Sequence, residues 1–113
     1  MAGYVVTIRS GAKVTHERAA DLDGGLRALE RRARELEQST RARPLGGTLV
    51  RRFDPVQQVA GRIELRGPRR QHAGVDIRGD GSAEAFTGRL RRTLVTQRDG
   101  ESPYDALRRE LSA

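Results

Sequence analysis

The amino-acid sequence predicts an α+β protein: a two-layer sandwich of order β-α-β-β-β-α, with a four-stranded sheet, two helices on one face and a short C-terminal helix. Three observations support this fold class. A β-branched run opens the chain, apolar residues recur at helical spacing in residues 19–38, and residues 56–78 largely alternate between apolar and polar side chains. Because amphipathic helices bury one stripe and alternating strands bury one face, these elements are expected to cover each other.

The first two elements are a strand and a helix. Residues 4–9 are rich in β-branched side chains and end at a Ser-Gly pair, which is typical of a strand. The polar residues 10–18 are expected to form a loop. A helix is predicted over residues 19–38, and its glycine pair weakens the first turn by about 1 kcal/mol per glycine, so the start is expected after Asp21. The residues expected on its buried stripe are Leu22, Leu26, Leu29, Ala33 and Leu36.

Three strands are expected in the middle of the chain. Residues 41–47 contain proline and two glycines and predict a loop, and residues 48–53 predict a short strand that ends at an Asp-Pro turn. Residues 56–66 and 72–78 both alternate, and the short basic turn between them predicts an antiparallel hairpin. The residues expected to face the core are Val59, Gly61, Ile63, Leu65, Ala73, Val75 and Ile77.

Two helices are expected to close the chain. Ser82 follows a Gly-Asp-Gly turn and is predicted to cap a second helix over residues 82–98, in which Phe86, Leu90 and Leu94 repeat every four residues. The run Ser102-Pro103-Tyr104-Asp105 has the pattern of another helix start, and Leu107 and Leu111 follow at helical spacing. The expected organisation is a sandwich domain over residues 1–98 and a short helical extension over residues 99–113.

The charge balance predicts a polyanionic partner. The chain has 22 basic and 15 acidic residues, a net charge of +7, and Lys13 is its only lysine. Arginine presents a planar fork of donors that suits phosphate oxygens, and a strongly basic domain is typical of nucleic-acid binders. A GC-rich genome would explain arginine in place of lysine but not the surplus of positive charge. The two Tyr, two Phe and no Trp argue against a base-stacking platform, which favours structured RNA.

Other functional classes receive less support. The chain has no cysteine, no apolar run long enough to cross a membrane and no signal-peptide pattern at its start, so a cytoplasmic protein without a membrane partner is expected. His16 and His72 lack a local partner pattern, so neither is predicted to be catalytic and the protein is not expected to be an enzyme. The acids Asp76, Asp80 and Glu84 are interpreted as turn formers and caps, so no metal or cofactor is expected.

The chain resembles the ribosome hibernation promoting factor family, also called ribosome-associated inhibitor A or sigma-54 modulation proteins. Residues 6–9, 49–55, 59–65 and 72–77 look like its four strands, and residues 82–94 look like its final basic helix. The resemblance implies binding to ribosomal RNA in the small-subunit channel for mRNA and tRNA, which blocks translation during stress. It places RNA contacts on Arg89, Arg91, Arg92, Arg31, Arg34, Arg51 and Arg52; the basic hairpin turn adds Arg69 and Arg70 to the predicted set.

Three alternatives remain open at this point. One is a different RNA- or DNA-binding module, such as a double-stranded-RNA-binding type. Another is a non-catalytic, homo-oligomeric or phage-related assembly protein that uses the exposed face or edge of its sheet. The last is a ribonuclease, since RNA cleavage needs little more than Arg, His or Glu beside a phosphate.

Overall fold

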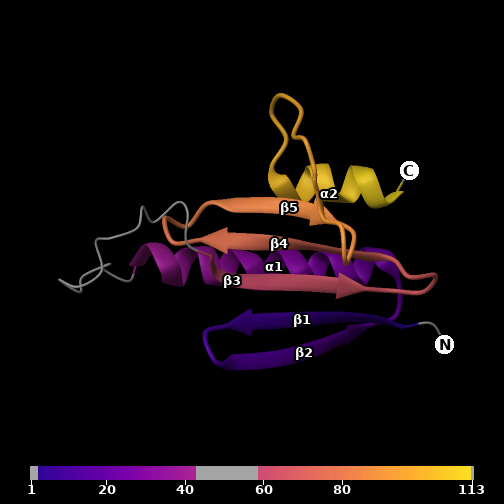
Figure 1. The fold of residues 1–113 in the computed structure, drawn as a ribbon, viewed down its shortest axis with the longest axis horizontal. Coiled ribbons are helices and arrows are strands. Elements are labelled where there is room, and N and C mark those ends of the chain that lie inside the picture. The colour runs from indigo at the N-terminus through magenta and orange to yellow at the C-terminus, as the bar shows by residue number, and fades with distance from the viewer. Residues whose placement is uncertain (1–2, 43–58, 113) are drawn as a thin grey trace.

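The part of the chain that the structure describes folds into one antiparallel sheet with two helices. The computed structural model describes residues 3–42 and 59–112. Within these ranges the sheet has six strands in the order β2-β1-β3-β4-β5-β6, and α1 lies behind the central strands in Figure 1. The α+β class is confirmed, whereas the prediction of a four-stranded sheet is wrong. The elements are β1 (Tyr4–Ser10), β2 (Lys13–Ala19), α1 (Leu22–Ala42), β3 (Val59–Arg66), β4 (His72–Arg78), β5 (Ala83–Thr87), β6 (Thr93–Leu94) and α2 (Pro103–Ser112).

Helix α1 begins where the sequence predicted. The carboxylate Oδ1 of Asp21 accepts a hydrogen bond from the Gly24 nitrogen at 2.8 Å, which caps the first turn. Gly25 lets the helix approach the sheet closely, because a Cβ there would lie 2.8 Å from Leu65 Cδ1. The predicted apolar stripe is confirmed: Leu26, Leu29 and Ala33 are buried, and Leu22 and Leu36 pack against the core.

The loop predicted for residues 10–18 is largely a strand. A turn at Gly11, with φ of 61°, leads into β2, which pairs with β1 and forms one edge of the sheet. This strand has no apolar face that a sequence pattern could reveal. On the face toward α1, Glu17 is opposite the buried Val6 and binds Arg31 and Arg32 of the helix. An edge strand can therefore be covered by ion pairs in place of apolar packing.

The predicted hairpin of β3 and β4 is confirmed. Ile63 is opposite Val75, and the expected alternation buries every predicted core position of the two strands except Val59, which precedes a β-bulge and is 44% exposed. At the turn, the Gln71 nitrogen donates to the Pro68 oxygen at 3.1 Å. The two central residues of the turn, Arg69 and Arg70, have φ of 59° and 61°. This is the type I′ geometry of tight hairpins.

The prediction of a helix over residues 82–98 is wrong. Residues Ala83–Thr87 form β5 beside β4, and Ser82 does not cap a helix but donates from its nitrogen and hydroxyl to Asp80 Oδ1 at 2.9 and 2.6 Å. The four-residue repeat was misleading because its members do not share a buried stripe. Phe86 is 1% exposed, whereas Leu90 and Leu94 are 93% and 60% exposed. Period-four spacing over two turns is too short to separate a helix from a strand with a loop.

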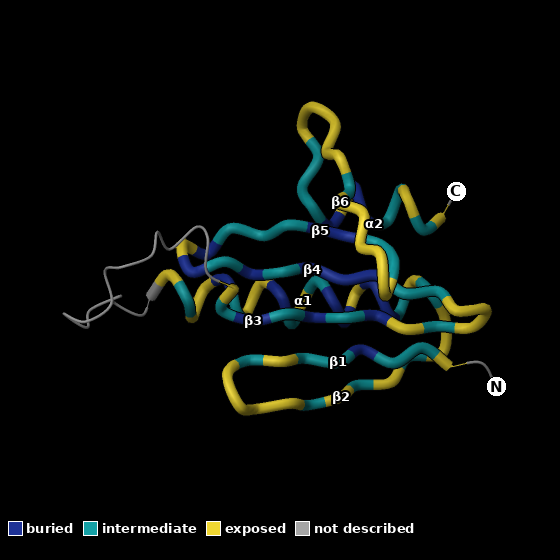
Figure 2. Tube along the Cα trace, in the orientation of Figure 1, coloured by how far each residue is buried: buried dark blue, intermediate teal, exposed yellow. Residues whose placement is uncertain are grey.

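Helix α2 has the predicted start and completes the core. The Ser102 hydroxyl accepts from the Asp105 nitrogen at 3.0 Å, and Asp105 Oδ2 accepts from the Ser102 nitrogen at 3.3 Å, which is a reciprocal cap. Leu107 and Tyr104 belong to the core cluster, and Figure 2 shows α2 beside β5. The Tyr104 hydroxyl donates to the buried Glu37 carboxylate of α1. Burial and this neighbouring carboxylate raise the pKa of Tyr104.

The start of α2 is expected to be sensitive to acid. Two hydrogen bonds from Arg109, at 2.8 and 2.9 Å, lower the pKa of Glu101 from about 4.5 to about 2. Because the pKa is depressed in the folded state, the pair stabilises the protein above pH 4.5 and loses this effect as the pH falls toward 2. Thermal unfolding of Glu101→Gln should therefore resemble wild type near pH 2 and occur at a lower temperature at pH 6. Glu110→Gln is the matched control, and an equal effect of both substitutions at pH 6 would contradict the assignment.

Neither helix in the described ranges is long and apolar enough to cross a membrane. The predicted strand over residues 48–53, with Arg51 and Arg52, lies outside the described residues.

Candidate nucleic-acid interface

The two faces of the sheet differ in chemistry. Both helices lie on one face, toward which Val6, Ile63 and Val75 point into the core. The opposite face, called here the open face, carries the alternate residues of the same strands. In the middle of the open face the strand register places Thr7, Glu64, Gly74 and Phe86 in one row across four strands.

Phe86 is an aromatic residue of the open face but offers no stacking surface. Its ring lies over Gly74, where a Cβ would come within 2.6 Å of the ring. The guanidinium carbons of Arg62 and Arg92 lie 5.6 and 5.0 Å from the ring centroid, and the ring is buried beneath them. These are cation–π distances. The aromatic side chain therefore positions arginines over the sheet and leaves no exposed ring for a base.

Two adjacent hollows on the open face share four lining residues and are together called here the trough. One hollow, of about 570 Å³, lies between the β3–β4 turn and the loop after β5. The other, of about 300 Å³, extends the trough toward β1. Both are lined by Arg66, His72, Arg89 and Leu90; the first adds Gly67, Arg70 and Gln71, and the second adds Thr7, Arg9, Glu64 and Arg92.

The loop after β5 is attached to the start of β4 at Gly88. The Gly88 nitrogen donates to the His72 oxygen at 2.8 Å, and the His72 ring Nδ1 lies 3.1 Å from the Gly88 oxygen. Gly88 has φ of 92°, a conformation that favours glycine. Figure 2 shows the exposed loop passing in front of β4. This attachment holds Arg89 and Leu90 beside Arg66.

Among the described residues that line the trough, Glu64 is the only carboxylate. Oxygens of Glu64 lie 3.2 Å from Arg9 Nε, 3.4 Å from His72 Nε2 and 3.9 Å from Arg92 Nη2. Glu64 therefore balances charge at the β1 end of the trough. Within the described part of the chain, no carboxylate lies within 4.0 Å of the guanidinium nitrogens of Arg66, Arg70 or Arg89. The other end of the trough is consequently an uncompensated positive surface.

The structure brings together only part of the predicted RNA-binding set. Arg70, Arg89 and Arg92 line the trough, and Arg91 is exposed in the same loop, although these loop residues are not helical as predicted. Arg69 lines a different hollow, with Tyr4, Leu22 and Leu111, on the helix side of the hairpin turn.

The two predicted helix arginines lie away from the trough and are paired. Arg31 binds Glu17, and Arg34 Nε lies 2.8 Å from Glu30 Oε2. Hydrogen bonds from Arg31 and Arg32 hold the pKa of Glu17 below its ordinary value, and the bond to Glu30 raises the pKa of Arg34. These guanidinium groups are on the helix side of the sheet. They do not form one surface with the trough arginines.

Four ionisable trough residues were missed by the sequence analysis: Arg9, Glu64, Arg66 and His72. The signal for Arg66 and Glu64 was present, because in an alternating strand the residues between the buried ones share the opposite face. The loop that covers the trough could not be deduced in the same way, since the chain segment after β4 was assigned to a helix.

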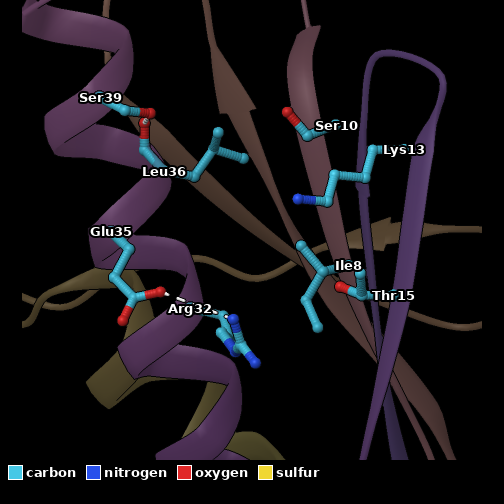
Figure 3. A pocket seen from close by; sticks show the side chains of 8 residues that line it. All are labelled: Ile8, Ser10, Lys13, Thr15, Arg32, Glu35, Leu36 and Ser39. Atoms are coloured by element: carbon cyan, nitrogen blue, oxygen red, sulfur yellow. Dashed lines mark hydrogen bonds and ion pairs between the residues drawn. The ribbon is translucent and has the colours of Figure 1, made fainter.

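Another hollow on the helix side has a lining in which positive and negative charges are more evenly balanced. It holds about 370 Å³ between α1 and the β1–β2 hairpin, and Figure 3 shows Ile8 and Leu36 facing each other across it. Its Arg32 is 3.1 Å from Glu17 and 3.8 Å from Glu35. The hollow therefore presents less free positive charge than the trough. Its lining residues are Ile8, Ser10, Lys13, Thr15, Arg32, Glu35, Leu36 and Ser39.

The described residues hold no group of three or more His, Asp or Glu side chains arranged for a metal ion. Asp76 binds Arg62, Glu84 binds Arg78, and Asp80 accepts the bonds from Ser82 described above.

Comparisons with known proteins give no relative: no protein family, curated protein or solved structure was found to match the chain.

Proposed function

We propose that the protein binds structured RNA, without cleaving it, by placing phosphate groups in the open-face trough. The observation that carries this proposal is the convergence of Arg66, Arg70 and Arg89 on one hollow, with no carboxylate partner among the described residues. Guanidinium groups that lack an internal partner are free to bind phosphate oxygens in pairs. The buried position of Phe86 favours backbone contacts over base stacking on an aromatic ring.

The backbone of the hairpin turn supports the same proposal. Arg69 and Arg70 both have positive φ, which costs a residue other than glycine roughly 1 kcal/mol. Asn-Gly is the favoured pair in this turn type, so a sequence selected for stability alone would not place two arginines here. Strained backbone is characteristic of functional positions. The side chain of Arg70 lies in the trough, which gives the strain a function at that residue.

The turn therefore allows a matched pair of substitutions. Arg70→Gly and Arg69→Gly each remove one positive charge and one positive-φ side chain, so each should raise the free energy of unfolding by about 0.5–1 kcal/mol. Only Arg70→Gly should weaken RNA binding. It should also reduce, by about 1, the magnitude of the slope of log K against log salt concentration, where K is the association constant for RNA. Thermal unfolding and fluorescence titrations at several salt concentrations measure both effects. Equal RNA affinities of the two variants would contradict the proposed trough.

The narrower prediction, a hibernation-type inhibitor on the small ribosomal subunit, rests on the resemblance alone. The residues that resembled the family's final helix form β5, the loop that follows it and β6. Sedimentation through a sucrose gradient tests this partner directly. The expected result is co-migration with the small subunit at low salt and release at high salt; migration only in ribosome-free fractions at low salt would exclude it.

RNA cleavage is the second candidate, favoured by the 3.4 Å contact between Glu64 and His72 inside the trough. A carboxylate and an imidazole beside arginines can act as base, acid and charge stabiliser for a phosphodiester. We propose binding alone because both groups already have structural partners: Glu64 binds Arg9, and His72 holds the loop at Gly88. Release of a fragment with a 2′,3′-cyclic phosphate by wild type, but not by Glu64→Gln, would establish cleavage in place of this proposal.

A further inference from the structure

The larger hollow of the trough has a lining that phosphate binding does not explain. Besides its three arginines it holds Gln71 and Leu90. Leu90 is 93% exposed and projects from the loop between Arg89 and Arg91. A phosphate site does not need an apolar wall or a side-chain amide. Both features suit a ligand that has a flat apolar face and hydrogen-bonding edges.

We propose that this hollow binds one unpaired nucleotide that projects from the RNA, such as a bulged residue in a hairpin. This inference rests on the proposed function and names its target more narrowly. The volume of about 570 Å³ falls in the range of roughly 300 to 1,000 Å³ found for small-molecule sites. Bases in a continuous RNA helix are paired and stacked inside the duplex, so only an extruded base can enter a recessed hollow.

Each element of the lining has a role in this arrangement. Leu90 and the methylene groups of the arginines provide an apolar wall for the face of the base. The Gln71 amide can donate to and accept from a base edge. Arg66, Arg70 and Arg89 surround the hollow and are placed to bind the phosphates on either side of the nucleotide.

The hollow depends on two loops being held together. The Gly88 nitrogen and the His72 oxygen join the loop after β5 to the start of β4 at 2.8 Å, next to the hairpin turn. The backbone of Gln71 is fixed by the turn itself. Its backbone nitrogen donates to the Pro68 oxygen, and its backbone oxygen accepts from the Gly67 nitrogen at 2.9 Å. The backbone segments that carry Leu90 and Gln71 are therefore held in place before a ligand arrives, which limits the ordering cost of binding to their side chains.

The test uses two labelled RNA hairpins that differ by one bulged nucleotide. Wild type should bind the bulged hairpin roughly 10-fold more tightly, in keeping with the contribution of one base contact. Leu90→Ser and Gln71→Ala should each reduce this preference to 3-fold or less, with affinity for the fully paired hairpin and its salt slope unchanged. Leu94→Ser is the matched control, because Leu94 is also exposed but lies outside the trough.

The outcomes separate this inference from the proposed function. Equal binding of both hairpins with a steep salt dependence would overturn the nucleotide site and leave phosphate binding intact. Absence of binding to either hairpin would overturn both. Binding to phosphatidylserine vesicles that is lost in Leu90→Ser, without a preference for the bulge, would overturn the inference in favour of a membrane surface.

Discussion

Replacing Arg66, Arg70 and Arg89 together with serine is expected to weaken binding of a structured RNA by on the order of 100-fold at physiological salt. The expected loss follows from the removal of about three phosphate contacts, which should also lower the salt slope of log K by about 3. The side chains of these residues line the trough and make no ion pair within the described ranges. Circular dichroism should therefore be unchanged.

The control for this variant must remove the same charge from the other side of the sheet. Arg27, Arg31 and Arg34 of α1 are exposed and paired with Asp23, Glu17 and Glu30. Their triple replacement with serine lowers the net charge equally. Exposed pairs of this kind contribute little to stability. If both triple variants lose RNA affinity to the same extent, binding depends on total charge and not on the trough.

Leu107→Ala is expected to cause a large loss of stability. The side chain is fully buried and belongs to the core cluster. Removing a buried leucine side chain costs about 2–5 kcal/mol, because apolar contacts are lost and a cavity remains. For a domain of this size a loss of about 3 kcal/mol lowers the unfolding midpoint by on the order of 10 to 20 °C. Calorimetry or urea denaturation measures the change.

Leu111→Ala provides the comparison on the same helix. Leu111 lies four residues later, so it shares the same side of α2, but it is only partly buried against the core. Its replacement should cost clearly less than that of Leu107. If the two variants unfold at the same temperature, the deeper burial of Leu107 does not determine how strongly α2 is held on the core.

Elements encoded by neighbouring residues were predicted correctly, whereas elements that depend on contacts between distant segments were not. Three features were predicted because residues close in the sequence encode them. They are the apolar stripe of α1, the β3–β4 hairpin and the reciprocal cap of α2. Strand β2 and the true conformation of residues 82–98 were not predicted. Strand β2 is joined to α1 by the ion pairs of Glu17. Phe86 of β5 is buried against Gly74 and beneath Arg62 of β3 and Arg92 of the loop.

For the candidate site, the sequence by itself determined the surplus of arginine, the basic hairpin turn and the absence of thiol chemistry. It also determined that a folded α+β protein with one buried sheet face would form. Only the tertiary structure decided which guanidinium groups are neutralised and which remain free. An arginine is neutralised by a carboxylate that folding brings within about 4 Å, and for Arg31 that partner is 14 residues away. Such distances depend on strand order, which composition and local spacing do not encode.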